Sequence, residues 1–214
     1  MSSSNLFQDG HTNGSKEWSA ALSASYNYVS KYEADSTNGS VKLEPYKLAA
    51  PWLQIQGQYG LTDRLDVGGS FGLGLFTLGF QGFSKLSLFP NDQKFGISAF
   101  GLVGYATLNE NFNTNNESVN YYNFLVGLPL SYSFTSKNSL VFQPMISWDN
   151  YIYKFPEDGV VYMGEQHTMA YRLGLGWIHT NSKANKVHYN LALNYSEASG
   201  RVLPSLGIAV HPAK

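Results

Sequence analysis

The chain has 214 residues, with 14 Lys and Arg against 15 Asp and Glu, a formal net charge of -1 and no cysteine. This balance lacks the basic footprint of a nucleic-acid-binding protein, and the lack of cysteine excludes disulfides and thiol chemistry. Charged residues make up 14% and aromatics 15%, whereas soluble domains usually carry about 25% charged residues. The mean hydropathy of -0.22 and the absence of a run of about 18 apolar residues exclude a membrane-spanning helix.

Residues 1–15 are polar and rich in Ser, Asn and Gly, which predicts a flexible N-terminal tether ahead of a single domain over residues 16–214. The opening lacks the charged and apolar regions of a signal peptide. We therefore expect the chain to begin at or near the mature N-terminus. The alternative is that Met1 or a nearby Ser stands in place of a lipidated cysteine.

Residues 16–30 alternate apolar and polar side chains with a period of two. Trp18, Leu22 and Tyr26 fall on one face, and Ser19 and Ser23 on the other. Successive strand residues point to opposite faces, so this pattern predicts a strand with one apolar and one polar side.

The pattern returns along the whole chain. A polar connection is expected over residues 31–49, and residues 61–64 read as a tight turn after the second strand. Long connections are also expected at 109–118 and 155–166, and short ones at 90–92, 135–139 and 181–186. The predicted strands are 16–30, 50–60, 65–75, 78–88, 95–105, 122–134, 140–148, 169–177, 187–195 and 201–210.

These strands carry more apolar side chains than one soluble core can bury. They predict an all-β fold, an antiparallel up-and-down transmembrane β-barrel with an apolar exterior and a polar lumen, in a bacterial outer membrane. The alternation of long and short connections places both termini on the periplasmic side and requires an even strand number, so we expect about ten strands, with eight or twelve as alternatives. Aromatic residues near the strand ends suit interfacial girdles, although aromatics are also common in soluble sandwiches.

The string from Tyr59 to Gly69, YGLTDRLDVGG, resembles a segment common in small bacterial outer-membrane β-barrels, in which a strand ends at a Thr-Asp-Arg turn and the next begins. Residues 5–14 resemble the opening of such proteins, several of which are lipoproteins. The resemblance covers roughly the first third of the chain and implies architecture without an activity. Such barrels often end in Phe, whereas this chain ends in Lys214.

Strand parity assigns the lumen-facing side chains. It predicts that Leu125, Ser131 and Arg172 face the lumen while Phe124, Leu130 and Leu173 face lipid, because a slip of one residue would exchange the faces. The polar network predicted for the lumen comprises Asp66, Lys85, Asp149, Arg172 and His188. Since a narrow lumen does not tolerate unpaired charge, we expect Lys85 and Arg172 each to pair with a carboxylate, with Asp66 and Asp149 as the nearest options.

The function predicted from the sequence is non-enzymatic: a scaffold, an accessory subunit or a surface-binding barrel in contact with the lipid bilayer. The alternatives are a narrow channel for small solutes and an enzyme at the barrel rim that acts on lipid or protein. A protein partner would contact the long outer connections through aromatic anchors, although these rings could equally extend the outer girdle. The anchor candidates are Tyr32, Tyr46, Phe112, Phe155 and Tyr162.

Residues that could serve a rim enzyme are present, but no spacing links them into a recognised nucleophile motif. They are Asp149, Asn150, His167, His179, His188 and Glu197. We therefore predict no catalytic residue, no metal ligand and no cofactor from the sequence.

Overall fold

The computed structural model describes residues 8–35, 40–74, 77–90, 94–109, 118–157, 160–181, 185–197 and 200–211. Within these ranges no helix is long and apolar enough to span a membrane. The strands are β1 (Trp18–Asp35), β2 (Ser40–Gly60), β3 (Leu65–Gly74), β4 (Thr77–Ser87), β5 (Phe95–Asn109), β6 (Ser118–Gly127), β7 (Leu130–Thr135), β8 (Asn138–Glu157), β9 (Val160–Thr180), β10 (Lys186–Ser196) and β11 (Arg201–His211).

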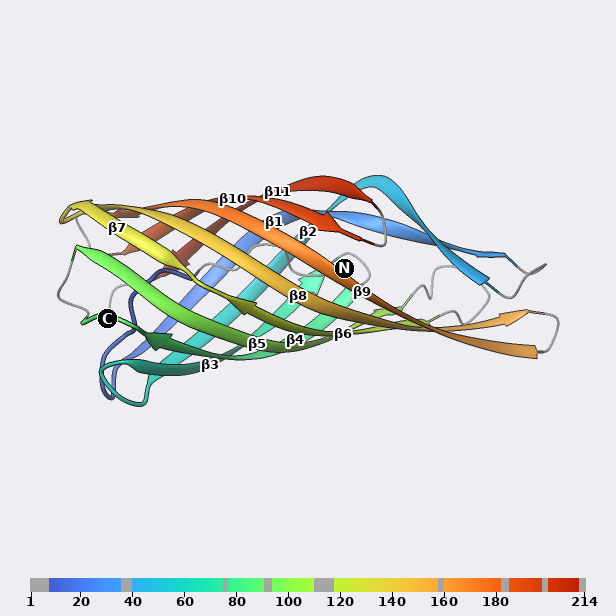
Figure 1. Ribbon diagram of the computed structural model, residues 1–214, viewed down its shortest axis with the longest axis horizontal. Coiled ribbons are helices and arrows are strands. Elements are labelled where there is room, and N and C mark those ends of the chain that lie inside the picture. Colours follow the sequence, from blue (N-terminus) through green and yellow to red (C-terminus); the bar gives the residue numbers. More distant parts are fainter. Residues whose placement is uncertain are drawn as a thin grey trace.

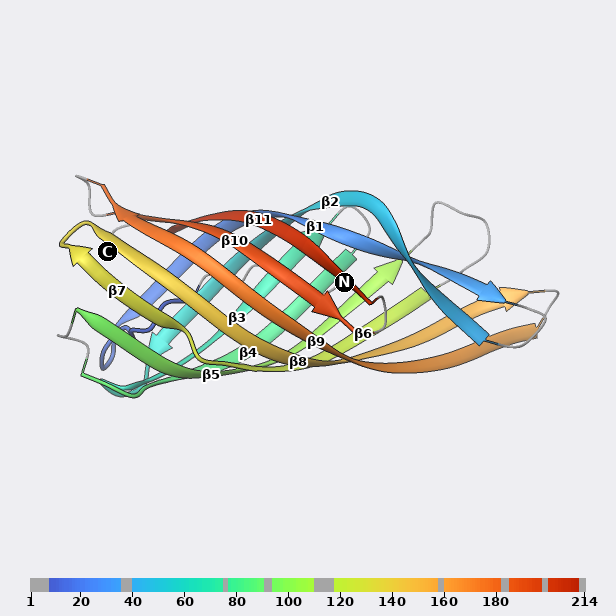
Figure 2. The ribbon, with the colours of Figure 1, turned by 45° about the horizontal axis from the view of Figure 1, so that its top comes forward.

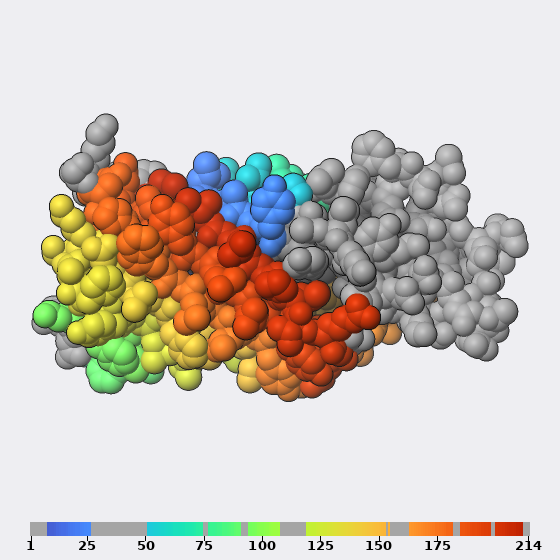
Figure 3. All heavy atoms as spheres, turned by 90° about the horizontal axis from the view of Figure 1, so that it is seen from above, coloured from blue at the N-terminus to red at the C-terminus, as the bar shows by residue number. Residues whose placement is uncertain are grey.

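The strands form one closed antiparallel sheet. Each wall strand pairs with its neighbour in sequence, β1 pairs with β11, and the pairing of β4 with β5 completes the circle. Figures 1 and 2 show the resulting tilted cylinder, and Figure 3 shows the blue side chains of β1 beside the red ones of the C-terminal strands. The predicted antiparallel up-and-down barrel is confirmed.

β6 and β7 are two parts of one wall strand. Both lie between β5 and β8, and the strand is interrupted only at Leu128 and Pro129. Proline has no N–H and removes a bond from the ladder. The gap is bridged by Leu128 N–H donating to the Pro144 carbonyl (3.1 Å) and Ser98 N–H donating to the Pro129 carbonyl (3.0 Å). The described chain therefore builds ten wall strands, as predicted, with one interrupted.

The predicted strand parity is confirmed. Leu125, Ser131 and Arg172 retain 0%, 2% and 4% exposure, whereas Phe124 and Leu173 retain 48% and 42%. Leu130, adjacent to Ser131 and on the opposite face, is partly exposed. Large apolar side chains therefore cover the outside of the barrel and the polar set turns inward.

The two ends of the barrel differ. At one end, which we term the short-turn end, Trp18 stands opposite Tyr59 and His211 opposite Lys186, so β1 begins where β11 finishes. At the other, the hairpin end, the β1–β2 and β8–β9 pairs extend farther than the rest of the wall (Figure 1).

The prediction of loops over residues 31–49 and 155–166 is wrong, because paired strands occupy most of both stretches. The β1–β2 register runs on to Asp35 opposite Ser40, and the β8–β9 register to Glu157 opposite Val160. The alternation there is short, as in Tyr32 and Ala34 between Lys31, Glu33 and Asp35, and the Asn38-Gly39 turn signal among polar residues favoured a loop. Most of the third predicted connection, at residues 110–117, lies outside the described residues.

Exposed aromatic side chains form two belts on the outer surface. The first, near the short-turn end, comprises Trp18, Tyr59, Phe95, Tyr132, Trp177 and Tyr189. The second, toward the hairpin end, comprises Tyr26, Phe80, Tyr122, Trp148, Tyr171 and Tyr195. Exposed aliphatic side chains such as Leu22, Ile55 and Leu175 lie between them. This distribution matches the apolar band, about 25 Å tall, of a membrane β-barrel.

A charge placed in this band should destabilise the barrel in lipid. Leu175 is exposed on β9 between the belts, so Leu175→Arg is expected to lower the free energy of unfolding by about 2–4 kcal/mol. Urea unfolding in phospholipid vesicles measures the change. Ser136→Arg, in the exposed turn between β7 and β8, is the matched control and should have no such effect. Equal effects of the two substitutions would contradict the assigned membrane band.

Candidate functional site

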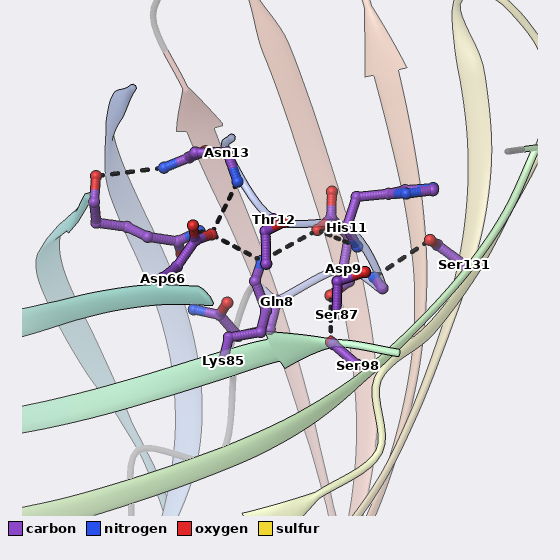
Figure 4. A network of polar contacts seen from close by, with 12 residues as sticks. Gln8, Asp9, His11, Thr12, Asn13, Asp66, Lys85, Ser87, Ser98 and Ser131 are labelled. Atoms are coloured by element: carbon purple, nitrogen blue, oxygen red, sulfur yellow. Dashed lines mark hydrogen bonds and ion pairs between the residues drawn. The ribbon is translucent and has the colours of Figure 1, made fainter. Parts of the chain in front are cut away.

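The N-terminal segment, residues 8–17, enters the lumen from the short-turn end. Lys16 N–H donates to the Gly60 carbonyl, and Gly60 N–H donates to the Glu17 carbonyl, both at 2.8 Å. From this anchor the segment runs back between the walls, and Gln8 and Thr12 keep only 1% and 8% exposure (Figure 4). Residues 8–14 thus lie inside the barrel, whereas the sequence predicted a flexible tether over residues 1–15; residues 1–7 are outside the described residues.

Glycines allow the segment to turn and to approach the wall. Gly14 has a φ of +94°, a conformation in which glycine avoids the strain of a Cβ atom. A Cβ on Gly10 would lie 2.2 Å from the Gly96 carbonyl oxygen, so the two backbones touch only because side chains are absent. The small residues that suggested a loose tether are therefore those that let the chain fit inside the barrel.

Lys85 of β4 lies between two carboxylates at the base of the lumen. Its Nζ is 3.3 Å from Asp9 Oδ1 and 4.0 Å from Asp66 Oδ2. Asp66 also accepts hydrogen bonds from Asn13 N–H (2.8 Å) and from the Gln58 side-chain amide. Lys85 and Asp66 are 3% and 0% exposed, so the N-terminal segment supplies a second anion to a cation that would otherwise have one close partner.

Three further strands, β5, β7 and β8, also bind the N-terminal segment. Gly10 N–H donates to Ser131 Oγ of β7 (3.2 Å), and Ser98 Oγ of β5 donates to the Asp9 carbonyl (3.3 Å). The Gln143 side-chain amide of β8 donates to the Gln8 carbonyl. Strands on several sides of the barrel are thus cross-linked through the segment, which makes it a structural part of the barrel.

The charge on Asp9 is stable at neutral pH. Burial raises the pKa of the Asp9 carboxyl, but the nearby ammonium groups of Lys85 and Lys186, with the backbone N–H of His11, outweigh burial and hold that pKa well below its usual range. The stabilisation from ionised Asp9 is therefore fully present above about pH 4, near the unfolded pKa, and fades only as the pH falls toward the folded pKa.

A second ionic cluster lies farther toward the hairpin end. Arg172 of β9 is 4.0 Å from Asp149 Oδ1 of β8 and donates to Ser147 Oγ at 3.3 Å. Tyr121 OH donates to Asp149 at 2.9 Å, and its ring lies 4.9 Å from that of Tyr151. The pair is buried, and the bonds of Arg172 to Ser147 and of Tyr121 to Asp149 support it, as an ion pair of low exposure requires.

An apolar layer separates the two ionic clusters. Along the inner face of β8, Gln143 contacts the N-terminal segment, Met145 belongs to the apolar layer, and Ser147 and Asp149 belong to the second cluster. The layer comprises Phe83, Phe100, Leu102, Leu125 and Met145.

Small residues of β1, β10 and β11 are buried too, at 5% for Ala21, 2% for Ala192 and 0% for Ala209. A methyl group on the wall of an open pore would be exposed. The described lumen is therefore filled by protein at these levels.

The structure places every lumen residue predicted from the sequence on the inner face. It brings Lys85 to Asp66 and Arg172 to Asp149, and it seats His188 against Gly176, with 1% exposure. Sequence reasoning missed Asp9, because its segment shows no periodicity and was assigned to the tether.

The predicted rim residues that the structure describes do not gather. His179 Nδ1 lies 2.9 Å from Asn138 Oδ1 near the short-turn end, whereas exposed His167 lies 3.6 Å from Glu165 in the β9 part of the long hairpin. The described residues contain no group of three or more His, Cys, Asp or Glu arranged to hold a metal ion. Of the anchor candidates, Phe112 lies outside the described residues, and for four others only the strand backbone is described; these are Tyr32, Tyr46, Phe155 and Tyr162.

A family model described as a membrane bound beta barrel domain (DUF5777) matches residues 18–211. The chain belongs to this family. It is a small outer-membrane β-barrel protein, as the closed sheet and the apolar outer band require.

Among solved structures the chain is similar to Ail, the attachment invasion locus protein of Yersinia pestis. The TM-score is 0.38 and the identity 14%, over 92% of this chain and 97% of that chain. A structure of Ail with the heparin analogue sucrose octasulfate gives a TM-score of 0.40 and 13% identity, with the same coverage. Likeness at this level carries no argument about function. A search of curated protein sequences found no significant match.

Loss of the Asp149 carboxylate should leave Arg172 without its anion in a buried site. Asp149→Asn is expected to lower the free energy of unfolding by about 3–5 kcal/mol, measured by urea titration in vesicles. Glu165→Gln, which removes an exposed partner of His167, is the control and should change stability by about 1 kcal/mol or less. If both variants matched the parent protein, the second ionic cluster would not stabilise the barrel.

Proposed function

We propose that this barrel is a non-enzymatic binding or scaffold protein of the bacterial outer membrane, and that its hairpin end makes the contacts. The observation that carries the proposal is the length of two strand pairs. β1, β2, β8 and β9 have 18, 21, 20 and 21 residues, whereas β3, β4, β10 and β11 have 10 or 11. A strand crosses a membrane with about 9–11 residues, so about half of each long strand lies beyond it.

The projecting parts are paired strands. The β8–β9 pair keeps one register to within a few residues of its tip, and the β1–β2 pair continues to its tip after a register shift between Val29 and Ser30. At about 3.3 Å per residue and a tilt of about 40°, they extend roughly 20 Å past the aromatic belt. A paired hairpin offers a preformed surface, and a partner that binds it does not have to order a loose loop.

The described part of the β8–β9 hairpin has side chains suited to contact. Met163 is 72% exposed, and exposed Glu165 accepts a hydrogen bond from the Asn150 side-chain amide (2.7 Å). Lipid does not account for an exposed Met beyond the aromatic belt, and flexible Met side chains are frequent at adaptable binding surfaces.

The filled lumen argues against the channel alternative. Its N-terminal segment, apolar layer and second ionic cluster lie one after another along the inside of the barrel. About ten strands leave room for little beyond side chains. The dispersed histidines give the rim-enzyme alternative no assembled site among the described residues.

The orientation is part of the proposal. Barrels of this class have short turns on the periplasmic side and longer connections outside. The proposed topology therefore places both termini and the short-turn end in the periplasm, with the two long hairpins at the cell surface.

Single cysteines test the orientation, because the chain has none of its own. Met163→Cys should react with a membrane-impermeant maleimide on intact cells, whereas Ser136→Cys should react only after the outer membrane is opened. Labelling of Ser136→Cys alone on intact cells would reverse the topology.

The binding role is tested by shortening both hairpins. Residues 31–44 and 154–163 are each replaced by a two-residue turn, and a photoreactive amino acid at Glu165 reports contacts in cells. The full-length protein is expected to give a discrete cross-linked species that the shortened protein loses, while both resist unfolding by detergent at room temperature. In a control protein, residues 181–185 at the short-turn end are replaced by a two-residue turn, and this protein should keep the cross-link. Unchanged cross-linking after shortening would contradict a role for the hairpins.

The filled lumen also predicts the electrical behaviour of the protein. In planar lipid bilayers the purified protein should show no large, stable conductance steps, because side chains and the N-terminal segment fill the narrow interior. A known open porin, added to the same bilayers, is the control that shows that insertion of an open channel is detected. Reproducible large open-channel steps from the purified protein would favour the channel alternative.

A further inference from the structure

One edge of strand β9 has no neighbouring strand at the hairpin end. β8 pairs with β9 from Val160 to His179, whereas β10 pairs with β9 only from Ala170 onward. Figure 1 shows β9 running on beyond the hairpin that joins β10 to β11. Among the described residues, the part of β9 before Ala170 therefore has a strand on its β8 side only.

Two backbone hydrogen bonds show which groups of β9 point to this free edge. Thr180 N–H donates to the Lys137 carbonyl on the β8 side (2.8 Å), and the Met169 carbonyl accepts from Glu197 N–H on the β10 side (3.0 Å). In an antiparallel ladder the N–H and carbonyl of one residue point to the same side, and the side alternates along the strand. The β8–β9 register does not shift, so alternate residues before Met169 direct both backbone groups to the free edge. These are Met163, Glu165 and His167.

The other free edges at the hairpin end carry features that prevent pairing. Proteins protect edge strands from unwanted partners with prolines, bulges and charges. The part of β2 beyond its β3 partners contains Pro45 and Pro51, and the part of β11 beyond its β1 partners contains Pro204. The projecting part of β1 has a register shift between Val29 and Ser30.

The free edge of β9 has no such protection. Residues 160–168 contain no Pro, Lys or Arg, and their register with β8 is regular. At about 3.3 Å per residue they offer an edge roughly 30 Å long. Donors and acceptors spaced along a regular strand match the backbone of another extended chain, so the chemistry of this edge selects a polypeptide strand.

The side chains along the edge select the charge of that strand. Glu165 is the only charged side chain of residues 160–168 when histidine is neutral, and it is exposed together with Met163 and His167. Glu197 adds a second carboxylate where the free edge begins. Opposite charges that face each other across two strands stabilise the pairing, and like charges weaken it. A strand with a cationic side chain therefore fits this edge.

We propose that the free edge of β9 binds an extended segment of a partner protein, which adds to the wall as an antiparallel strand in line with β10 and places a Lys or Arg opposite Glu165. The proposal rests on the contact role of the hairpin end and names its mode of binding. Backbone hydrogen bonds supply the affinity, and the cation fixes the register.

The test measures binding of a fluorescent peptide, Thr-Val-Thr-Val-Lys-Val-Thr-Val-Thr, to the full chain in detergent micelles by fluorescence anisotropy. His167→Pro removes an N–H from the free edge and leaves the groups that pair with β8. It should weaken binding about tenfold, equivalent to about 1.4 kcal/mol. His167→Ala, the matched control, removes the side chain and keeps the N–H, so it should bind like the parent protein.

The charge is tested separately. Glu165→Gln should weaken binding of this peptide and leave unchanged the binding of a peptide with Gln in place of Lys. Folding of each variant is checked by its heat-dependent shift in gel mobility, and Met163→Pro with Met163→Ala replaces the first pair if His167→Pro does not fold. The proposal is overturned if the parent protein does not bind the peptide, or if the proline and alanine variants bind it alike.

Cross-linking in cells separates this proposal from the contact role of the hairpins, with the photoreactive amino acid at Met163 so that Glu165 is kept. Loss of the cross-link in His167→Pro but not in His167→Ala supports pairing at the edge. A cross-link that His167→Pro retains overturns edge pairing and leaves the contact role intact. A dimer of the chain that only His167→Pro abolishes would make the occupant a second copy and overturn the proposed partner.

Discussion

Closure of the sheet is the constraint on which the rest of the molecule depends. In hydrocarbon an unpaired backbone N–H or carbonyl has no water to bind, at a cost of several kcal/mol for each group. The pairing of β1 with β11 joins the first strand to the last and removes the two edges that an open sheet would leave. Once the sheet is closed, each residue must point either to lipid or to the lumen, and the alternation of the sequence follows.

Closure with ten wall strands also makes the interior narrow. The narrow interior determines which charged side chains the lumen can hold. Charged groups enclosed there need partners, because an isolated buried ion is far more costly than a paired one. Arg172 finds its carboxylate on the neighbouring strand. Lys85 has Asp66 on the neighbouring strand and also Asp9, which belongs to the N-terminal segment inside the lumen. The N-terminal segment is therefore held by the ion pair of Asp9 with Lys85 and by the close approach of Gly10 to Gly96 of β5.

How much the sequence could predict follows from the same physics. Parity is absolute inside the membrane, so the inward position of Leu125 and the outward position of Phe124 could be predicted without coordinates. Residues 31–49 and 155–166 are richer in polar residues and turn signals, so these parts of the strand pairs looked like polar loops. Their register, with Lys31 opposite Glu44 and Glu33 opposite Lys42, becomes meaningful only when the pairing is known.

The course of residues 8–15 could not be predicted either, because an irregular segment inside a lumen has no periodicity of its own. The interruption of β6/β7 did leave a signal in the sequence. Pro129 falls within an otherwise regular alternation, and a proline inside a wall strand removes a hydrogen bond of the ladder.

The proposed function assigns stability to one end of the barrel and contact to the other. At the short-turn end the anchor of Lys16 on Gly60 and the ion pairs of Lys85 tie the first described residues to several strands. At the hairpin end β1–β2 and β8–β9 continue the wall strands as paired strands, β8–β9 in one register and β1–β2 after a register shift between Val29 and Ser30. A surface carried in this way is ordered before any partner arrives. It loses little further conformational entropy on binding, and this is the physical advantage of long strands over long loops at this end of the molecule.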